Sequence, residues 1–347
     1  MPMIQFLSNC SVDGLAIAAK SLRQGSLVAF PTETVYGLGA DATNAQAVAR
    51  IYEVKGRPVD HPLIVHIADL KYLEQWISDI PEYAIVLARE FWPGPMTLIL
   101  QRSELAKDFI TGGQGSVGIR IPDNSLALGL LDAFHKLGGA GIAAPSANRF
   151  GQVSPTTAEA VQEELGNYLS DTDLVLDGGP SVVGVESTII DCTGELPRIL
   201  RPGAITIEMI EEVSGLKVSD STEKKSEEVS GLKVSDSTEK KSDDFKREDI
   251  RVSGSLEIHY APKAKVFLDQ QPVYGSGFIA IKSINTPNGV IRLAAPESVE
   301  EFARVLYSAL REGDHQGLSS IYIEQPIGNG LAVAIRDRLA RSTQGRN

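Results

Sequence analysis

The sequence predicts an α/β protein with two domains joined by a linker, and three observations support this prediction. Residues 1–210 alternate short apolar runs with amphipathic stretches, which is typical of strands and helices layered on a sheet. The composition changes abruptly at Glu211 and becomes strongly charged. A second alternation of strand-like and helix-like segments follows. The predicted divisions are a first domain, a linker, a second domain and a tail, at 1–210, 211–262, 263–342 and 343–347.

The elements of the first domain follow from apolar spacing and from Gly, Pro and capping residues. Helical spacing predicts helices at 13–23, 44–54, 81–91 and 126–137, with Asn44 as an N-cap. Apolar runs predict strands at 27–30, 63–67, 96–100, 116–121, 141–144, 174–176 and 186–191. Residues 31–41 are predicted to be a loop that offers polar side chains and bare glycine backbone to a ligand.

The predicted linker contains a tandem duplication, because residues 211–226 recur unchanged as residues 227–242. Residues 211–250 carry 12 acidic and 8 basic residues, with Phe245 as the only aromatic, so the segment has too little apolar surface to order itself. We expect it to be flexible. In the second domain, strands are predicted at 263–268, 278–282, 290–294 and 320–323, and helices at 299–311 and 330–339.

Composition and charge exclude several classes of protein. Hydrophobic residues make up 42% and charged residues 22%, as in ordinary globular proteins. No apolar run approaches the roughly 20 residues that span a bilayer, and no signal peptide is visible. Cys10 and Cys192 are the only cysteines, too few for a disulfide scaffold or zinc cluster. A net charge of −12 argues against a general nucleic-acid binder. We expect a cytoplasmic protein without a membrane or DNA partner.

Lys55 and Arg57 form the first candidate site. They lie on a turn broken by glycine and proline, just before the strand predicted at 63–67. A compact ammonium beside a forked guanidinium suits a polyphosphate. The alternative is that Lys55 stabilises the end of its helix and that Arg57 is solvated.

Several other polar positions have two interpretations from their local sequence. Arg120 lies on a strand beside a glycine, where it has room for a ligand or forms a solvated edge. His66, in an otherwise apolar strand, is a ligand-binding residue or a buried structural histidine. Ser146 and Asn148 follow a buried strand, where they bind a ligand or begin a turn.

The common catalytic motifs are absent from the sequence, which contains no Walker A, Gly-x-Ser-x-Gly or His-Glu-x-x-His. What it offers is a set of distributed cations, which suits phosphoryl or nucleotidyl transfer by positioning and charge stabilisation. Arg201 belongs to this set if it points at the end of the sheet, and it is otherwise a surface residue before a turn. Tyr260 is a binding residue or an interdomain packing residue.

Five ordered motifs resemble the Sua5/YrdC family of threonylcarbamoyl-AMP synthases. They are 31–38 (PTETVYGL), 55–57 (KGR), 145–148 (PSAN), 186–188 (EST) and 259–262 (HYAP). The long Sua5 form fits better than the short YrdC form, because a second globular segment follows the last motif. The resemblance implies a YrdC-like twisted mixed sheet with helices, and a smaller Rossmann-like α/β domain at the C-terminus.

The resemblance also implies a reaction. L-threonine, bicarbonate or CO2, and ATP would give L-threonylcarbamoyladenylate and pyrophosphate, and the adenylate would supply the N6-threonylcarbamoyl group of adenosine 37 in tRNAs. Mg²⁺ is expected with ATP, and the sequence does not identify its protein ligands. tRNA, double-stranded RNA or a transfer protein would be downstream partners.

The family's functional residues carry over by motif position. The catalytic residues would be Lys55 and Arg57. The ATP side would comprise Lys55, Arg57, His61, Ser116, Ala144, Asn148, Ser154, Arg201 and Tyr260. The L-threonine side would comprise Thr34, His66, Arg120, Ser146 and Ser187, with Arg120 pairing the substrate carboxylate.

Two other classes of function stay open at this point. A non-catalytic RNA-binding module should lack the threonine-specific residues, yet Thr34, His66 and Arg120 are all present. A carbamoyl-transferring or carbamoyl-phosphate-hydrolysing enzyme should carry acylphosphatase-like and zinc-finger segments, and two cysteines cannot supply the latter.

Overall fold

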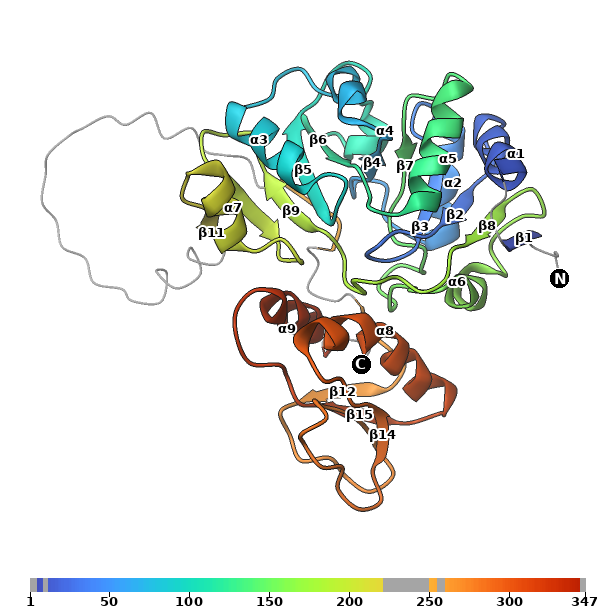
Figure 1. Cartoon of the computed structure of the whole chain (residues 1–347). Helices are drawn as coiled ribbons and strands as arrows, with labels where there is room; N and C mark the ends of the chain where they lie inside the picture. The colour runs from blue at the N-terminus through green and yellow to red at the C-terminus, as the bar shows by residue number, and fades with distance from the viewer. Residues whose placement is uncertain (1–4, 9–11, 221–249, 255–259, 344–347) are drawn as a thin grey trace, which may run out of the picture.

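The computed structural model describes residues 5–8, 12–220, 250–254 and 260–343. A larger domain is built on an 11-stranded sheet and a smaller one on a 4-stranded sheet (Figure 1), which confirms the predicted α/β class. Within the described ranges, no helix is both long and apolar enough to cross a membrane. The predictions for His259 and for residues 221–249 of the predicted linker, which include most of the duplication, fall outside the described residues.

The larger sheet is mixed, with the strand order β1-β8-β2-β3-β7-β4-β6-β5-β9-β10-β11. Its strands are β1 Gln5–Ser8, β2 Val28–Phe30, β3 Gly37–Asp41, β4 Ile64–His66, β5 Met96–Gln101, β6 Ser116–Arg120, β7 Ile142–Ala143, β8 Leu174–Asp177, β9 Thr188–Asp191, β10 Arg198–Arg201 and β11 Ser219–Asp220. The parallel pairing of β4 and β6 sets His66 directly opposite Arg120. Two candidate residues distant in sequence therefore become neighbours.

Helices cover both faces of this sheet. They are α1 Val12–Arg23, α2 Ala45–Lys55, α3 Glu82–Phe91, α4 Asp108–Thr111, α5 Ser125–Lys136, α6 Ala158–Leu165 and α7 Ile207–Ser214, with a 3-10 helix at Leu70–Gln75. α1 and α5 share one hydrophobic cluster through Leu22 and Phe134, and α2 and α3 belong to another through Val48 and Leu87. Asn44 caps α2 as predicted, accepting hydrogen bonds from two backbone N–H groups.

The prediction of a loop over 31–41 is wrong for its second half, which forms β3 between β2 and β7. The glycines serve close packing there, not a turn. A Cβ on Gly39 would lie 2.7 Å from Ile142 Cγ2 and 2.9 Å from Phe30 Cε1. A strand can pass between these two side chains only where the residue has no side chain of its own.

Ordered structure also continues past Glu211, where the linker was predicted to begin. α7 runs on to Ser214, and β11 pairs with β10. Ile210 anchors the helix, since it is fully buried in the core of the larger domain. The short apolar segment after it, with Val213, Leu216 and Val218, packs against the same core.

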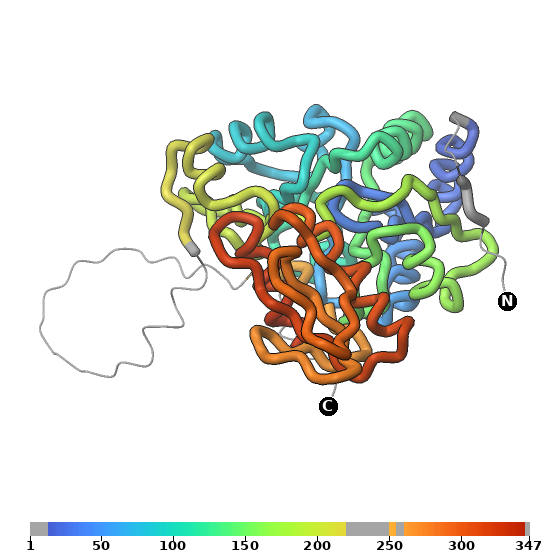
Figure 2. The backbone as a smooth tube through the Cα atoms, turned by 60° about the horizontal axis from the view of Figure 1, so that its bottom comes forward, coloured from blue at the N-terminus to red at the C-terminus, as the bar shows by residue number. Residues whose placement is uncertain are grey.

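The smaller domain is a parallel sheet in the order β12-β15-β13-β14, with two helices. Its elements are β12 Lys265–Leu268, β13 Gly277–Ile279, β14 Ile291–Ala294, α8 Val299–His315, β15 Ser320–Ile323 and α9 Leu331–Ser342. In Figures 1 and 2 the smaller domain lies against the larger one, and Figure 1 shows α8 and α9 between its sheet and the larger domain.

The two domains share a hydrophobic core. Val35, Val153 and Val185 of the larger domain belong to the same buried cluster as Phe302 and Leu306 of α8. Buried apolar surface of this kind favours a fixed arrangement over independently moving domains. The second domain can therefore affect the structure of the segments of the larger domain that contain Val35, Val153 and Val185.

Candidate functional site

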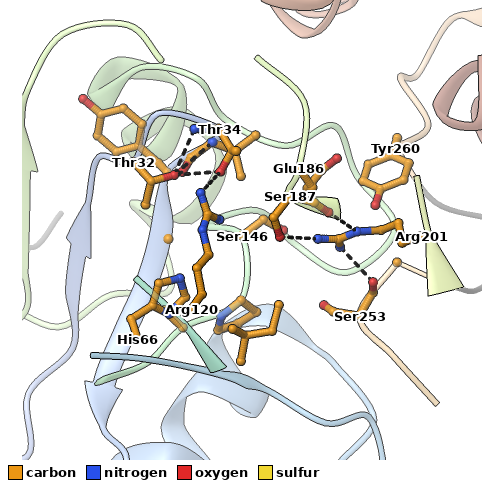
Figure 3. A pocket seen from close by; sticks show the side chains of 17 residues that line it. Thr32, Thr34, His66, Arg120, Ser146, Glu186, Ser187, Arg201, Ser253 and Tyr260 are labelled. Atoms are coloured by element: carbon orange, nitrogen blue, oxygen red, sulfur yellow. Dashed lines mark hydrogen bonds between the residues drawn. The ribbon is translucent and has the colours of Figure 1, made fainter. Parts of the chain in front are cut away.

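A polar pocket opens at the ends of the central strands and is bordered by the segment at 253–254 and by Tyr260 (Figure 3). All five residues predicted for the threonine side line it, together with three predicted for the ATP side. These eight are Thr34, His66, Ala144, Arg120, Ser146, Ser187, Arg201 and Tyr260. The structure thus brings together residues from seven separate places in the sequence around one cavity.

Arg120 is held at the pocket by two partners. Its Nη2 lies 2.7 Å from Glu33 Oε1 and donates to Thr34 Oγ1 at 2.9 Å. The residue is only 5% exposed, so the interpretation as a solvated edge arginine is wrong. Its Nε is buried and has no hydrogen-bond partner in the described part of the chain. Because a buried donor without a partner is unfavourable, this atom is suited to donate to a polar ligand.

His66 also has a buried ring nitrogen that could bind a polar ligand. It is 4% exposed, packs edge-on against the ring of Phe30, and its Nδ1 has no hydrogen-bond partner among the described residues. Burial and the neighbouring charge of Arg120 lower the pKa of His66 to about 3. The ring is therefore neutral at physiological pH, and its Nδ1 can form a hydrogen bond with a polar ligand.

Arg201 lies on the other side of the pocket and is buried, so the surface interpretation is wrong for this residue too. It donates from Nε to Ser187 O and from Nη2 to Ser187 Oγ, both at 3.1 Å. Its Nη1 donates to Ser253 O at 2.8 Å. The guanidinium therefore joins the approach to β9 to the segment that borders the pocket, as Figure 3 shows.

Lys55 and Arg57 lie behind the pocket wall and do not line the pocket. Lys55 Nζ donates to Ser146 O at 2.6 Å and to Asn148 O, and burial holds its pKa well below the ordinary value. Arg57 Nη2 donates to Pro62 O at 2.9 Å and to the hydroxyl of Ser253 at 3.3 Å. Arg57 is buried, not solvated. Both residues fix segments that do line the pocket, and their phosphate contacts stay a prediction.

Four other residues predicted for the ATP side also lie outside the pocket lining. Ser154 donates to Glu186 Oε1 at 2.6 Å, and Asn148 Nδ2 donates to two nearby carbonyls. The ring of His61 meets that of Phe150 edge-on, with centroids 5.5 Å apart. Ser116 lines a smaller neighbouring pocket together with Ser253, Ile99 and Val252.

Sequence reasoning left out Glu33, Glu186 and Ser253 as site residues. Burial raises the pKa of Glu186, but Arg338 and Arg201 outweigh that effect and lower it to about 2, so this carboxylate is ionised. An acidic residue at the entrance to the apolar strand β9 was the available signal. Glu33 had no comparable signal, because its partner Arg120 is remote in the sequence.

Comparisons with known proteins agree on one family. Residues 20–203 match the Sua5/YciO/YrdC family model, described as telomere recombination. Residues 205–343 match the model described as threonylcarbamoyl-AMP synthase, C-terminal domain.

The similarity to individual relatives extends over nearly the whole chain. The chain is 38% identical over 345 residues to threonylcarbamoyl-AMP synthase of Pyrococcus abyssi, which covers 95% of this chain and 94% of the relative. It is 39% identical over 355 residues to the Bacillus subtilis protein of the same name, which covers 96% and 93%. Its fold is similar to that of P. abyssi Sua5 complexed with L-threonine, with a TM-score of 0.81 at 36% identity, over 99% of this chain and 98% of that one.

Proposed function

From the premise that this chain belongs to the Sua5 family of threonylcarbamoyl-AMP synthases, we propose how its pocket makes L-threonylcarbamoyladenylate from L-threonine, bicarbonate and ATP. The observation that carries the proposal is the pair of buried, unpartnered atoms in the pocket, Arg120 Nε and His66 Nδ1. They belong to adjacent strands, directly opposite each other. A small ligand with a carboxylate and a second polar group would satisfy both.

L-threonine fits this description. Its carboxylate would accept from Arg120, whose guanidinium is already oriented by Glu33 and Thr34. Its hydroxyl or amine would lie near His66 and Ser146, which line the same pocket. A guanidinium held on one side by protein is suited to bind a carboxylate through its remaining donors, because little side-chain freedom is lost on binding.

The nucleotide would occupy the side of the pocket lined by Arg201 and Tyr260. The threonine amine would take up the carbon of bicarbonate with loss of water, giving a carbamate. A carbamate oxygen would then attack the α-phosphorus of ATP while the bond from that phosphorus to pyrophosphate breaks. Arg201 would stabilise charge on the phosphoryl oxygens, so the protein would contribute positioning and electrostatics.

Mg²⁺ would enter with ATP. The described residues contain no cluster of three or more His, Cys, Asp or Glu that could hold a metal. An ion held mostly by phosphates and waters would need no such cluster. When bound, the ion would shield phosphate charge. The downstream partner, tRNA or a transfer protein, stays a prediction.

The direct test is pyrophosphate release from ATP by the purified full chain, with threonine and bicarbonate omitted in turn. We expect release to require both. Arg120→Met should raise the KM for threonine, whereas Arg102→Met should leave it unchanged. Arg102 forms an ion pair of similar length, with Asp108 at 2.6 Å, but this pair is solvent-exposed and lies outside the pocket. Pyrophosphate release that does not depend on threonine would refute the proposed function.

A further inference from the structure

Arg338, on α9 of the smaller domain, reaches the wall of the pocket in the larger domain. It is 1% exposed. Its Nε donates to Glu186 Oε2 at 2.8 Å, its Nη2 donates to Pro202 O at 2.9 Å, and its guanidinium lies over the ring of Tyr260, 5.3 Å from the centroid. One side chain from the second domain therefore contacts three separate segments of the wall.

Each of these contacts is at or next to a pocket residue. Glu186 lines the pocket and precedes Ser187, Pro202 follows Arg201, and Tyr260 lines the pocket itself. Because adjacent residues share a planar peptide group, holding Glu186 and Pro202 restricts where the backbone of Ser187 and Arg201 can lie. Arg338 thus sets the geometry of the nucleotide side without touching the space where a ligand would bind.

Tyr260 needs this support because of its backbone. Its φ is 62°, a left-handed conformation that is unfavourable for residues other than glycine. Its ring stacks on Tyr307 of α8, with centroids 5.8 Å apart, and lies beneath Arg338. On its other side Gly254 leaves the necessary space, since a Cβ there would lie 2.4 Å from the Tyr260 hydroxyl. The second domain therefore holds this tyrosine in place.

Charge gives Arg338 a second role. Glu186 is 6% exposed and accepts from Arg338, from the Tyr307 hydroxyl at 2.9 Å and from Ser154. A buried carboxylate that loses its cation is strongly unfavourable. Arg201 is the other cation whose charge acts on Glu186. Without Arg338, the carboxylate would draw Arg201 away from its contacts with Ser187 and Ser253.

We propose that Arg338 is a positioning residue of the active site, through which the second domain orders Arg201 and Tyr260 for the nucleotide. This inference rests on the proposed function. Thr34 and Arg120 are held by each other and by Glu33, all within the larger domain. Loss of Arg338 should therefore weaken the use of ATP much more than the use of threonine.

The test compares Arg338→Met, which keeps the aliphatic stem, with Arg336→Met on the same helix. Arg336 donates only to carbonyls of its own domain, those of Pro326 and Gly328. For each full-length variant, KM for ATP and threonine, kcat and the melting temperature are measured by pyrophosphate release and calorimetry. We expect Arg338→Met to raise the KM for ATP at least tenfold and the KM for threonine less than threefold, with Arg336→Met unchanged in both.

A third variant separates positioning from simple loss of domain docking. Glu186→Gln combined with Arg338→Met removes the uncompensated carboxylate and should recover at least threefold of the lost ATP affinity. An unchanged KM for ATP in Arg338→Met, or no recovery in the double variant, would overturn the inference. Failure of the proposed function would differ from both outcomes, since the unmodified chain would then release no threonine-dependent pyrophosphate.

Discussion

Gly184 is the position where a single methyl group should separate the two domains. It lies in the loop before β9 with a φ of +83°. A Cβ at Gly184 would lie 2.4 Å from Arg304 Cα and 2.5 Å from Ala303 O. Both atoms belong to the backbone of α8, so no side-chain rotation can relieve the overlap. Gly184→Ala can be accommodated only if α8 or the loop that carries Gly184 shifts and the two separate.

The magnitude follows from two effects. A left-handed conformation costs about 1–2 kcal/mol for a residue with a side chain, and overpacking a well-packed site costs about 1–3 kcal/mol more. Gly184→Ala should therefore lower the free energy of unfolding by about 2–5 kcal/mol. Gly179→Ala is the matched control, because Gly179 has a φ of +73° and nothing lies within 4 Å of its added Cβ. The control should show the first effect alone.

The assay is urea unfolding of both variants, followed by circular dichroism and tryptophan fluorescence, together with pyrophosphate release. Gly184→Ala should lose at least 1 kcal/mol more stability than Gly179→Ala, about the lower limit for overpacking, and should also raise the KM for ATP because α8 and α9 carry Tyr307 and Arg338. Equal losses of stability in the two variants would refute the reasoning, since the contact with α8 would then have no energetic weight.

Three further outcomes are expected. Arg120→Lys should raise the KM for threonine about tenfold or more, which is a loss of about 1.4 kcal/mol in binding free energy. The reason is that Lys lacks the unpartnered Nε and the forked guanidinium. An unchanged KM would contradict the assigned role. Lys55→Met should lower the free energy of unfolding by about 1–3 kcal/mol, because two loop carbonyls lose their donor. Lys71→Met, at an exposed site, should leave the free energy of unfolding unchanged. Urea unfolding of the two variants measures the difference. The pKa of His66 is about 3 in the folded chain and about 6.5 in the unfolded chain, so stability should fall as pH drops from 6.5 towards 3, because only the unfolded chain gains the proton. His66→Asn should make this dependence of stability on pH less steep. An identical dependence in the variant would show that another group is responsible.

Glu33 and Arg338 show where sequence reasoning reaches its limit at the site. Motif spacing grouped Thr34, His66, Arg120, Ser146 and Ser187, and all five line one pocket. It could not show that Arg120 is oriented by Glu33, a partner on a different element. Nor could it show that Arg338 serves the same pocket from 152 residues away. A contact between distant residues depends on how whole domains dock, and no local pattern encodes that.

The elements show the same division. The sequence alone determined α2 from its Asn44 cap to its end at Lys55, the apolar central strands, and the chemical types gathered at the pocket, because these depend on neighbours a few residues away. Tertiary structure decided that Gly39 lies in a strand and not a loop. The residue must be glycine there because Phe30 and Ile142 leave no room for a side chain. It also decided that Lys55 turns its ammonium towards loop carbonyls. A glycine or a lysine has several uses, and only the surrounding packing selects one.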